Sequence, residues 1–264
     1  MHQSPAAISP VTNLRLSMSE RNLVIIPVYN EKENIERIIR YVFHLEVLFE
    51  ILVVEDNSPD GTADIVSTLQ TEFPERLHML NRPGKQGLGT AYIAGFRWAL
   101  QREYSYIFEM DADFSHNPDD LVRLLEACKN GADLSIGSRY ITGVNVVNWP
   151  MTRVLLSFFA SKYVRLITRM PVRDTTAGFV CYRRKTLEAI DLSAIQFKGY
   201  AFQIEMKFTA YIMGFNLREV SIIFTDRSLG TSKMSGGIFR EAFLGVLRMK
   251  AKSLLKMYPN QKRR

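Results

Sequence analysis

The sequence has 264 residues, of which 47% are apolar and 23% charged, and this composition fits a globular protein with one large core or two small ones. No run of about 18 apolar residues occurs, which excludes a membrane-spanning helix, and the first 20 residues lack a signal-peptide pattern. Residues 1–130 hold 12 Lys and Arg against 19 Asp and Glu, whereas residues 131–264 hold 22 against 8. The basic second half suits an anionic partner, such as nucleic acid, anionic lipid or a phosphate-bearing substrate.

Short apolar runs alternate with helical patterns through the first half of the chain. Such runs predict strands that are buried on both faces of a parallel sheet. The expected strands are 23–28, 51–54, 77–80, 106–110 and 133–137. The expected helices begin near Asn30, Thr62, Thr90 and Asn117, and Asn30 and Glu33 form a capping-box-like start for the first, which should end near Phe43. This alternation predicts a doubly wound, mostly parallel α/β sheet.

Polar segments follow three of these strands, at residues 27–31, 55–60 and 111–115. Because ligands bind beyond the carboxyl ends of the strands in such sheets, the three segments should converge on one crevice. Asp111 and Asp113 are two residues apart, so in extended backbone their side chains point the same way and can share one cation. Oxygen ligands that leave positions open for phosphate suit Mg²⁺ or Mn²⁺, and Ser115 can add a hydroxyl or hold a metal-bound water.

Other residues of these segments suit a nucleotide. Asp56 can accept hydrogen bonds from a base or ribose, and Tyr29 can line a base pocket. The glycine-rich stretch 84–90 is not a P-loop, because Met79 stands where the first glycine of that motif belongs, and an ATPase is rejected.

The basic second half contains candidate phosphate ligands and a candidate membrane helix. Arg139, Arg227 and Lys233 together resemble a phosphate clamp. Residues 153–169 predict an amphipathic helix in which Lys162, Arg165 and Arg169 flank a wide apolar face. Such a helix either lies in a membrane interface or packs on the sheet, and the sequence leaves both readings open.

The motifs resemble those of family 2 glycosyltransferases with the GT-A fold, and more closely those of dolichol- or polyprenol-phosphate mannosyltransferases. The matching strings are 26–31, 54–62, 84–91, 111–116, 137–140 and 227–233. Glu55 stands where relatives often have Asp. The Gln-x-x-Arg-Trp motif of processive polysaccharide synthases is absent. The expected organisation is therefore a loose extension at 1–20, a GT-A domain at 21–240 and a basic amphipathic segment at 241–264.

The resemblance implies an inverting transfer of mannose from GDP-mannose to a polyprenyl phosphate, with Mg²⁺ or Mn²⁺. It places the guanosine at Pro27, Tyr29, Glu31, Val54 and Asp56, the diphosphate and metal at Asp111, Ala112, Asp113 and Ser115, and phosphate or sugar at Arg139, Arg227 and Lys233. The metal would neutralise charge on the leaving diphosphate. The acceptor phosphate is anionic near neutral pH and needs no strong base.

The resemblance also implies a cytoplasmic protein at the membrane surface, attached by its own interfacial segments or through a membrane-anchoring partner. Three alternatives stay open at this point. One is transfer of glucose or another sugar from a UDP-sugar. The second is a non-catalytic domain that binds a membrane partner. The third, a nucleic-acid-binding domain, is disfavoured because no recognisable module interleaves aromatic and basic residues and because it leaves Asp111 and Asp113 unexplained.

Overall fold

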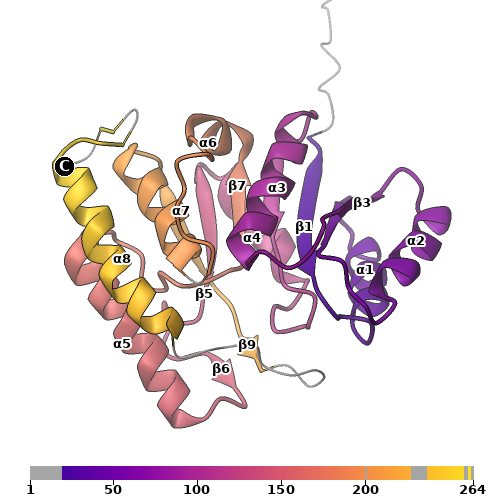
Figure 1. Ribbon diagram of the computed structural model, residues 1–264, viewed down its shortest axis with the longest axis horizontal. Helices are drawn as coiled ribbons and strands as arrows, with labels where there is room; N and C mark the ends of the chain where they lie inside the picture. Colours follow the sequence, from indigo (N-terminus) through magenta and orange to yellow (C-terminus); the bar gives the residue numbers. More distant parts are fainter. Residues whose placement is uncertain (1–19, 200, 227–236, 259–260, 263–264) are drawn as a thin grey trace, which may run out of the picture.

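The computed structural model describes residues 20–199, 201–226, 237–258 and 261–262. Its centre is a seven-stranded sheet in the order β3-β2-β1-β4-β7-β5-β8 (Figure 1). These strands are β1 (Asn22–Val28), β2 (Glu50–Glu55), β3 (Leu77–Asn81), β4 (Tyr106–Glu109), β5 (Leu134–Ser138), β7 (Val180–Arg183) and β8 (Leu217–Ser221). A separate two-stranded sheet pairs β6 (Val146–Val147) with β9 (Phe224–Thr225). The helices are α1 (Ile35–Phe43), α2 (Thr62–Glu72), α3 (Leu88–Leu100), α4 (Asp120–Lys129), α5 (Met151–Thr168), α6 (Arg184–Ala189), α7 (Ala201–Ile212) and α8 (Gly237–Leu254).

The expected doubly wound, mostly parallel sheet is confirmed. Strands β1 to β4 pair in parallel, and β5 pairs in parallel with β8. The exception is β7, which is antiparallel to both of its neighbours, β4 and β5. Within the sheet, β7 and β8 are the strands that the sequence analysis did not predict.

The start of the first helix was predicted wrongly. Asn30 has a φ of +57°, in the left-handed region rather than the extended one usual for an N-cap, and α1 begins at Ile35 with Asn34 as its N-cap. The backbone N–H groups of Asn34 and Ile35 both donate to the Glu31 carbonyl, at 3.0 and 2.9 Å. The amides of residues 30–32 bind the loop after β2 instead, which removes the need for a local capping box.

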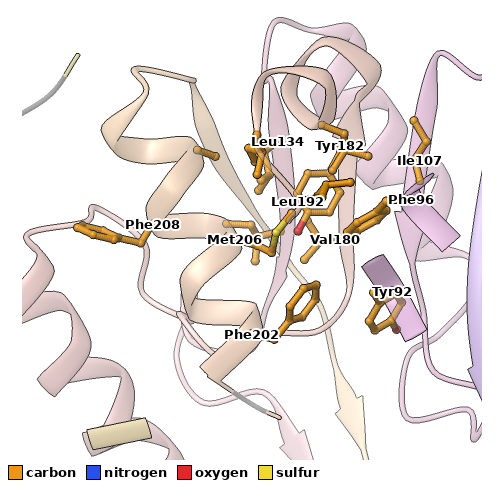
Figure 2. Close-up of a cluster of buried hydrophobic side chains, with 14 of the residues drawn as sticks. Tyr92, Phe96, Ile107, Leu134, Val180, Tyr182, Leu192, Phe202, Met206 and Phe208 are labelled. Atoms are coloured by element: carbon orange, nitrogen blue, oxygen red, sulfur yellow. The ribbon is translucent and has the colours of Figure 1, made fainter. Parts of the chain in front are cut away.

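Two apolar clusters cover the two faces of the sheet. Side chains alternate along a strand, so Leu23 and Ile25 of β1 join one cluster, and Val24 and Ile26 join the other. Figure 2 shows part of the first cluster, in which the stacked rings of Tyr92 and Phe202 lie 6.1 Å apart between α3 and α7. Because both faces of the sheet are packed, the ends of its strands, where the candidate site lies, are held in fixed positions.

Helix α5 presents most of its large apolar side chains outward. Its buried side chains are the small or short Ser161, Val164 and Thr168. The larger Phe159 and Leu166 are 58% and 77% exposed. The apolar face predicted for residues 153–169 is therefore divided: Tyr163 and Ile167 pack against the core cluster, whereas the rest of its large side chains are exposed.

Helix α8 lies beside α5 at the edge of the molecule away from α2 (Figure 1). Tyr163 of α5 stacks on Phe243 of α8, with ring centroids 4.5 Å apart, and its hydroxyl donates to the Phe243 carbonyl. The two helices and the residues directly after α8 leave a set of large apolar side chains exposed, which we call the α5–α8 apolar surface. It consists of Met151, Leu155, Leu156, Phe159, Leu166, Phe243, Leu244, Leu247, Leu254, Leu255 and Met257.

Among the described residues, no helix combines the length and the apolar character that crossing a bilayer requires.

Candidate active site

The loops after β1 and β2 are joined by hydrogen bonds from backbone amides to short polar side chains. The amide of Asn30 donates to Ser58 Oγ, and that of Glu31 donates to Thr62 Oγ1, both at 3.1 Å. Asp60 accepts the amides of Lys32 and Thr62. The Ser-Pro-Asp-Gly-Thr string therefore forms a turn whose side chains hold the loop after β1 in place.

The second loop also holds itself in place. The Glu55 carboxylate accepts the amides of Asn57 and Ser58, at 2.8 and 2.7 Å. Asn57 has a φ of +59°, a left-handed conformation that asparagine adopts more readily than most residues. Glu55 thus stabilises the turn, whereas the carboxylate of Asp56 faces Arg82 at the end of β3.

Polar side chains cluster where β1, β2 and β3 end. Arg82, directly after β3, lies 3.2 Å from the Asp56 carboxylate, and both side chains are 8% exposed. Arg82 Nη2 donates to Thr90 Oγ1, whereas Arg82 Nη1 is buried without a hydrogen-bond partner among the described residues. Burial raises the pKa of Asp56, against the opposing charge of Arg82. Lys85 Nζ lies 5.2 Å from the centre of the Tyr29 ring, which adds an aromatic wall.

The other predicted nucleoside ligands differ in their exposure. Pro27 and Val54 face each other in the register of β1 and β2. Val54 is fully buried in the apolar cluster beneath the crevice, and Pro27 is partly buried. Glu31 accepts a hydrogen bond from Asn34 Nδ2 at 3.1 Å. Their contacts with a nucleoside stay a prediction.

The two aspartates lie just after β4, which is parallel to β1. Asp111 has a side chain 37% exposed, whereas Asp113 is 7% exposed and its Oδ1 accepts the Ser115 amide at 3.0 Å. Between them and Ser115, Phe114 has a φ of +59°, which is strained for a bulky residue. Its ring contacts Tyr41, at 6.2 Å between centroids. This tight turn brings Asp111, Ala112, Asp113 and Ser115 to one edge of the sheet.

His116 supports the turn from inside the protein. Its ring is buried and stacks on Phe179 with centroids 4.7 Å apart, and Nδ1 accepts the Asp111 amide at 3.3 Å. Burial lowers the pKa of His116 to about 4, so the ring is neutral at pH 7 with its proton on Nε2. His116 therefore positions the backbone of Asp111, and the sequence analysis assigned it no role.

Arg139, predicted as a phosphate ligand, is held by a buried ion pair. Its backbone amide, Nε and Nη2 donate to the Asp174 carboxylate at 3.0, 2.6 and 2.6 Å, and Nη2 also donates to Thr176 Oγ1. Asp174 is completely buried. The guanidinium carbon lies 5.2 to 5.5 Å from the ring centres of Tyr140, Trp149 and Phe224. The ion pair therefore fixes where the cation of Arg139 sits.

The small β6–β9 sheet connects the aspartate turn to α5. The Thr225 amide donates to the Ser115 carbonyl at 3.3 Å. Asp226, the next residue, accepts two hydrogen bonds from Arg153 Nη1, at 2.9 and 3.0 Å, and Arg153 lies over the Trp149 ring. Arg227 and Lys233, which complete the predicted clamp, lie outside the described residues.

The described residues contain no group of three or more His, Cys, Asp or Glu side chains arranged to hold a metal ion. The turn after β4 offers a set of two carboxylates, Asp111 and Asp113, two residues apart in the chain. Such a set is too small for a closed all-protein site, but it matches the way Mg²⁺ is held together with substrate phosphates. The donor chemistry at this edge therefore fits a hard divalent cation.

Comparison with known proteins decides the family. The family model described as glycosyl transferase family 2 matches residues 23–191. The chain belongs to this family. Polyprenol monophosphomannose synthase of Mycolicibacterium smegmatis is 49% identical to this family 2 glycosyltransferase, over 92% of this chain and 89% of that protein. Undecaprenyl-phosphate mannosyltransferase of Micrococcus luteus is also 49% identical, over 86% of this chain and 93% of that protein.

Solved structures of low sequence identity share the fold of this glycosyltransferase. Glucosyl-3-phosphoglycerate synthase of Mycobacterium tuberculosis, in complex with UDP, has a TM-score of 0.62 at 15% identity, covering 88% of this chain and 81% of that one. A mannosyltransferase of Pyrobaculum calidifontis, in complex with GDP-Man and Mn²⁺, has a TM-score of 0.57 at 16% identity, covering 89% and 64%. These likenesses confirm the GT-A architecture.

Proposed function

We propose that this glycosyltransferase transfers mannose from GDP-mannose to a polyprenyl phosphate. The observation that carries the proposal is the 49% identity, over most of the chain, with a polyprenol monophosphomannose synthase and an undecaprenyl-phosphate mannosyltransferase. The arrangement supports it, because the Asp56–Arg82 cluster and the turn that carries Asp111 and Asp113 lie at the carboxyl ends of strands of one sheet. These are the two places that a nucleotide diphosphate must contact at once.

The donor would lie across the ends of β1, β2 and β4. Guanine carries both hydrogen-bond donors and acceptors, so it can bind the Asp56 carboxylate and the Arg82 guanidinium, while Tyr29 covers its ring. Glu31, with Pro27 and Val54 beneath, would complete the nucleoside site. Arg82 and Lys85 were not predicted as ligands, although both lie in the segment after β3 at the same sheet edge.

Asp111 and Asp113 would hold Mg²⁺ or Mn²⁺ together with the diphosphate, and the Ser115 hydroxyl would support the cation or one of its waters. Bound there, the cation would neutralise the charge that develops on the leaving diphosphate. His116 would keep the turn in place, since its neutral ring binds the Asp111 amide. Ala112 would offer its backbone to the diphosphate, as the resemblance implies.

The acceptor phosphate would attack the anomeric carbon directly and invert it. A phosphate monoester is largely ionised near pH 7, so the reaction needs no strong general base. Among the described residues, the histidine next to the aspartates is His116, which is buried and neutral and supports the turn. Arg139, Arg227 and Lys233 would supply the positive charge that brings two anionic substrates together.

We also propose that the α5–α8 apolar surface rests on the cytoplasmic face of a membrane. A polyprenyl chain is insoluble in water, so its phosphate must be met at the bilayer surface. An exposed apolar helix face next to basic residues is the pattern of an interfacial helix. Most of the predicted C-terminal segment, residues 241–264, belongs to α8, and it would act with α5 in this attachment, with or without a membrane-anchoring partner.

The experiment is a donor panel with purified protein, a short-chain polyprenyl phosphate in detergent and Mg²⁺ or Mn²⁺. GDP-mannose should be converted to GDP and a mannosyl lipid, with UDP-glucose and GDP-glucose as matched controls. Preference for a UDP-sugar would overturn the mannose assignment, and turnover that survives a chelator would remove the metal. Arg227→Ala and Lys233→Ala should weaken use of the acceptor more than binding of GDP; equal losses would argue against the clamp.

A further inference from the structure

Helix α5 carries a row of basic side chains along one edge of the α5–α8 apolar surface. Lys162, Arg165 and Arg169 are spaced by three and four residues, so they lie on one face of the helix, and all three are exposed. Phe159 and Leu166 flank Lys162 at three and four residues, and they are 58% and 77% exposed. A bilayer that covers these two apolar side chains would bring its headgroups level with the basic row.

Two hollows open along this row. The first has a volume of about 380 Å³ and is lined by Tyr140, Gly143, Val144, Phe158, Lys162, Arg165 and Arg173. The second has a volume of about 540 Å³ and is lined by Lys162, Arg165, Leu166, Arg169, Met170 and Pro171. Lys162 and Arg165 line both, so each hollow combines cations with apolar walls. This is the composition that a lipid headgroup with the start of its acyl chains would require.

No acidic side chain competes for these cations. Neither hollow is lined by Asp or Glu, and α5 contains none. In the part of the chain that the structure describes, Lys162, Arg165, Arg169 and Arg173 form no ion pair, whereas Arg153 at the other end of α5 is paired with Asp226. The nearby Glu219 accepts the backbone amides of residues 173 and 174. Arg173 Nη1 donates to the Ile141 carbonyl and Lys162 lies over the Phe158 ring, but no carboxylate of the described residues pairs with this row of cations.

We propose that the two hollows bind the phosphate groups of anionic phospholipids, so that the enzyme docks selectively on negatively charged bilayers. The inference rests on the proposed placement of the α5–α8 apolar surface at a membrane, and it adds the lipid class that the surface selects. Apolar contact alone would hold the protein on any fluid bilayer. The basic row adds attraction that grows with the anionic lipid content, at about fivefold in partition coefficient per cation, or about 1 kcal/mol each.

The test uses the full chain and protein-free vesicles of phosphatidylcholine, with or without phosphatidylglycerol, in a sedimentation assay at constant salt. The variant is the triple substitution Lys162→Gln, Arg165→Gln and Arg169→Gln. Its matched control removes three positive charges from α3, the turn after it and α4, as Arg97→Gln, Arg102→Gln and Lys129→Gln, all at exposed positions. Wild type and control should both prefer the phosphatidylglycerol vesicles.

The α5 variant should bind those vesicles more weakly by a factor on the order of 100, and it should lose the preference between the two compositions. Three results would overturn the proposal. One is an α5 variant that binds as the control does. Another is a wild-type protein that binds both compositions equally. The third is a wild-type protein that binds neither, which would assign the surface to a protein partner.

A turnover assay without vesicles separates this proposal from the proposed reaction. With a short-chain polyprenyl phosphate in detergent, the α5 variant should keep the wild-type kcat and KM for the acceptor. A large rise in its KM would mean that the hollows hold the acceptor's own phosphate, which contradicts a separate headgroup site. If wild type itself shows no turnover with any donor, the proposed reaction fails, while the vesicle result still decides the headgroup site.

Discussion

Replacing Arg139 by methionine would leave the Asp174 carboxylate buried without its counter-ion. Three of the donors to this carboxylate, at 2.6, 2.6 and 3.0 Å, come from Arg139, and Asp174 has no exposed surface. An exposed ion pair contributes about 0–1 kcal/mol, but breaking a buried one costs about 3–5 kcal/mol. Because the Arg139 side chain is only 9% exposed, the larger range applies. Arg139→Met should therefore lower the free energy of unfolding by about 3–5 kcal/mol.

Urea unfolding at pH 7 measures this loss as a shift in midpoint at an unchanged m-value. The matched control is Arg40→Met, which breaks two solvent-exposed pairs, with Glu36 and Glu72, and it should destabilise the protein far less than Arg139→Met does. In the double variant Arg139→Met with Asp174→Asn, both charges are gone, so its loss should be smaller than the sum of the two single losses. If Arg139→Met costs no more than Arg40→Met, the pair is screened by solvent and this reasoning is wrong.

The same variant should reverse the pH dependence that Asp174 contributes. Burial alone would raise the pKa of Asp174, but the charge and hydrogen bonds of Arg139 outweigh it and lower this pKa. In the wild type, the carboxylate therefore contributes stability above its unfolded pKa of about 3.9, and loses it as the pH falls through the folded pKa. Without Arg139 the folded pKa should rise above the unfolded value, so acidification from neutral pH should stabilise the variant relative to wild type.

Three further changes give distinct outcomes. Asp113→Asn should lose about 2 kcal/mol or more of transition-state stabilisation, and an unaltered kcat would remove Asp113 from the metal site. For Glu50, burial alone would raise the pKa, but hydrogen bonds from a histidine, an arginine and a tyrosine outweigh it and lower this pKa to about 2. The wild-type free energy of unfolding should therefore fall by about 1–2 kcal/mol as acid protonates Glu50 below pH about 4. Urea unfolding of Glu50→Gln should not show this loss. Gly245→Ala would place a methyl group 2.5 Å from the Phe197 ring and should lower the free energy of unfolding by about 1–3 kcal/mol. In the Phe197→Ala background the same change should cost much less, and fully additive losses would contradict this contact.

The first half of the fold was predictable because its signals are local. Each of β1 to β5 is a short apolar run, and such runs need no knowledge of the distant chain. The rule that ligands bind at strand carboxyl ends then brought Asp56 to the same sheet edge as Asp111 and Asp113. Arg82 follows β3 directly and could have been found by the same rule.

The rest depends on contacts between distant parts of the chain. β7 pairs antiparallel with β4, joining Tyr106 to Arg183, and nothing local in either segment indicates that partner. The Asp174 carboxylate becomes a ligand of Arg139 only because this pairing positions the chain before β7. For α5, a helical wheel finds the apolar face but cannot say which side of the helix is buried. In the structure the most buried side chains of α5 are Ser161, Val164 and Thr168.

The hydrogen bond from the Thr225 amide to the Ser115 carbonyl connects the aspartate turn with the segment that is anchored to α5. On one side, Ser115 closes the turn of the two aspartates, and on the other, Asp226 is anchored to Arg153 at the start of α5. The aspartate turn cannot shift without carrying this anchor along or breaking one of these bonds. Under the proposed reaction, binding of the sugar donor at the aspartates is thus coupled to the first turn of α5, the helix proposed to contact the lipid. The position of this turn should therefore differ between the empty and the donor-bound enzyme.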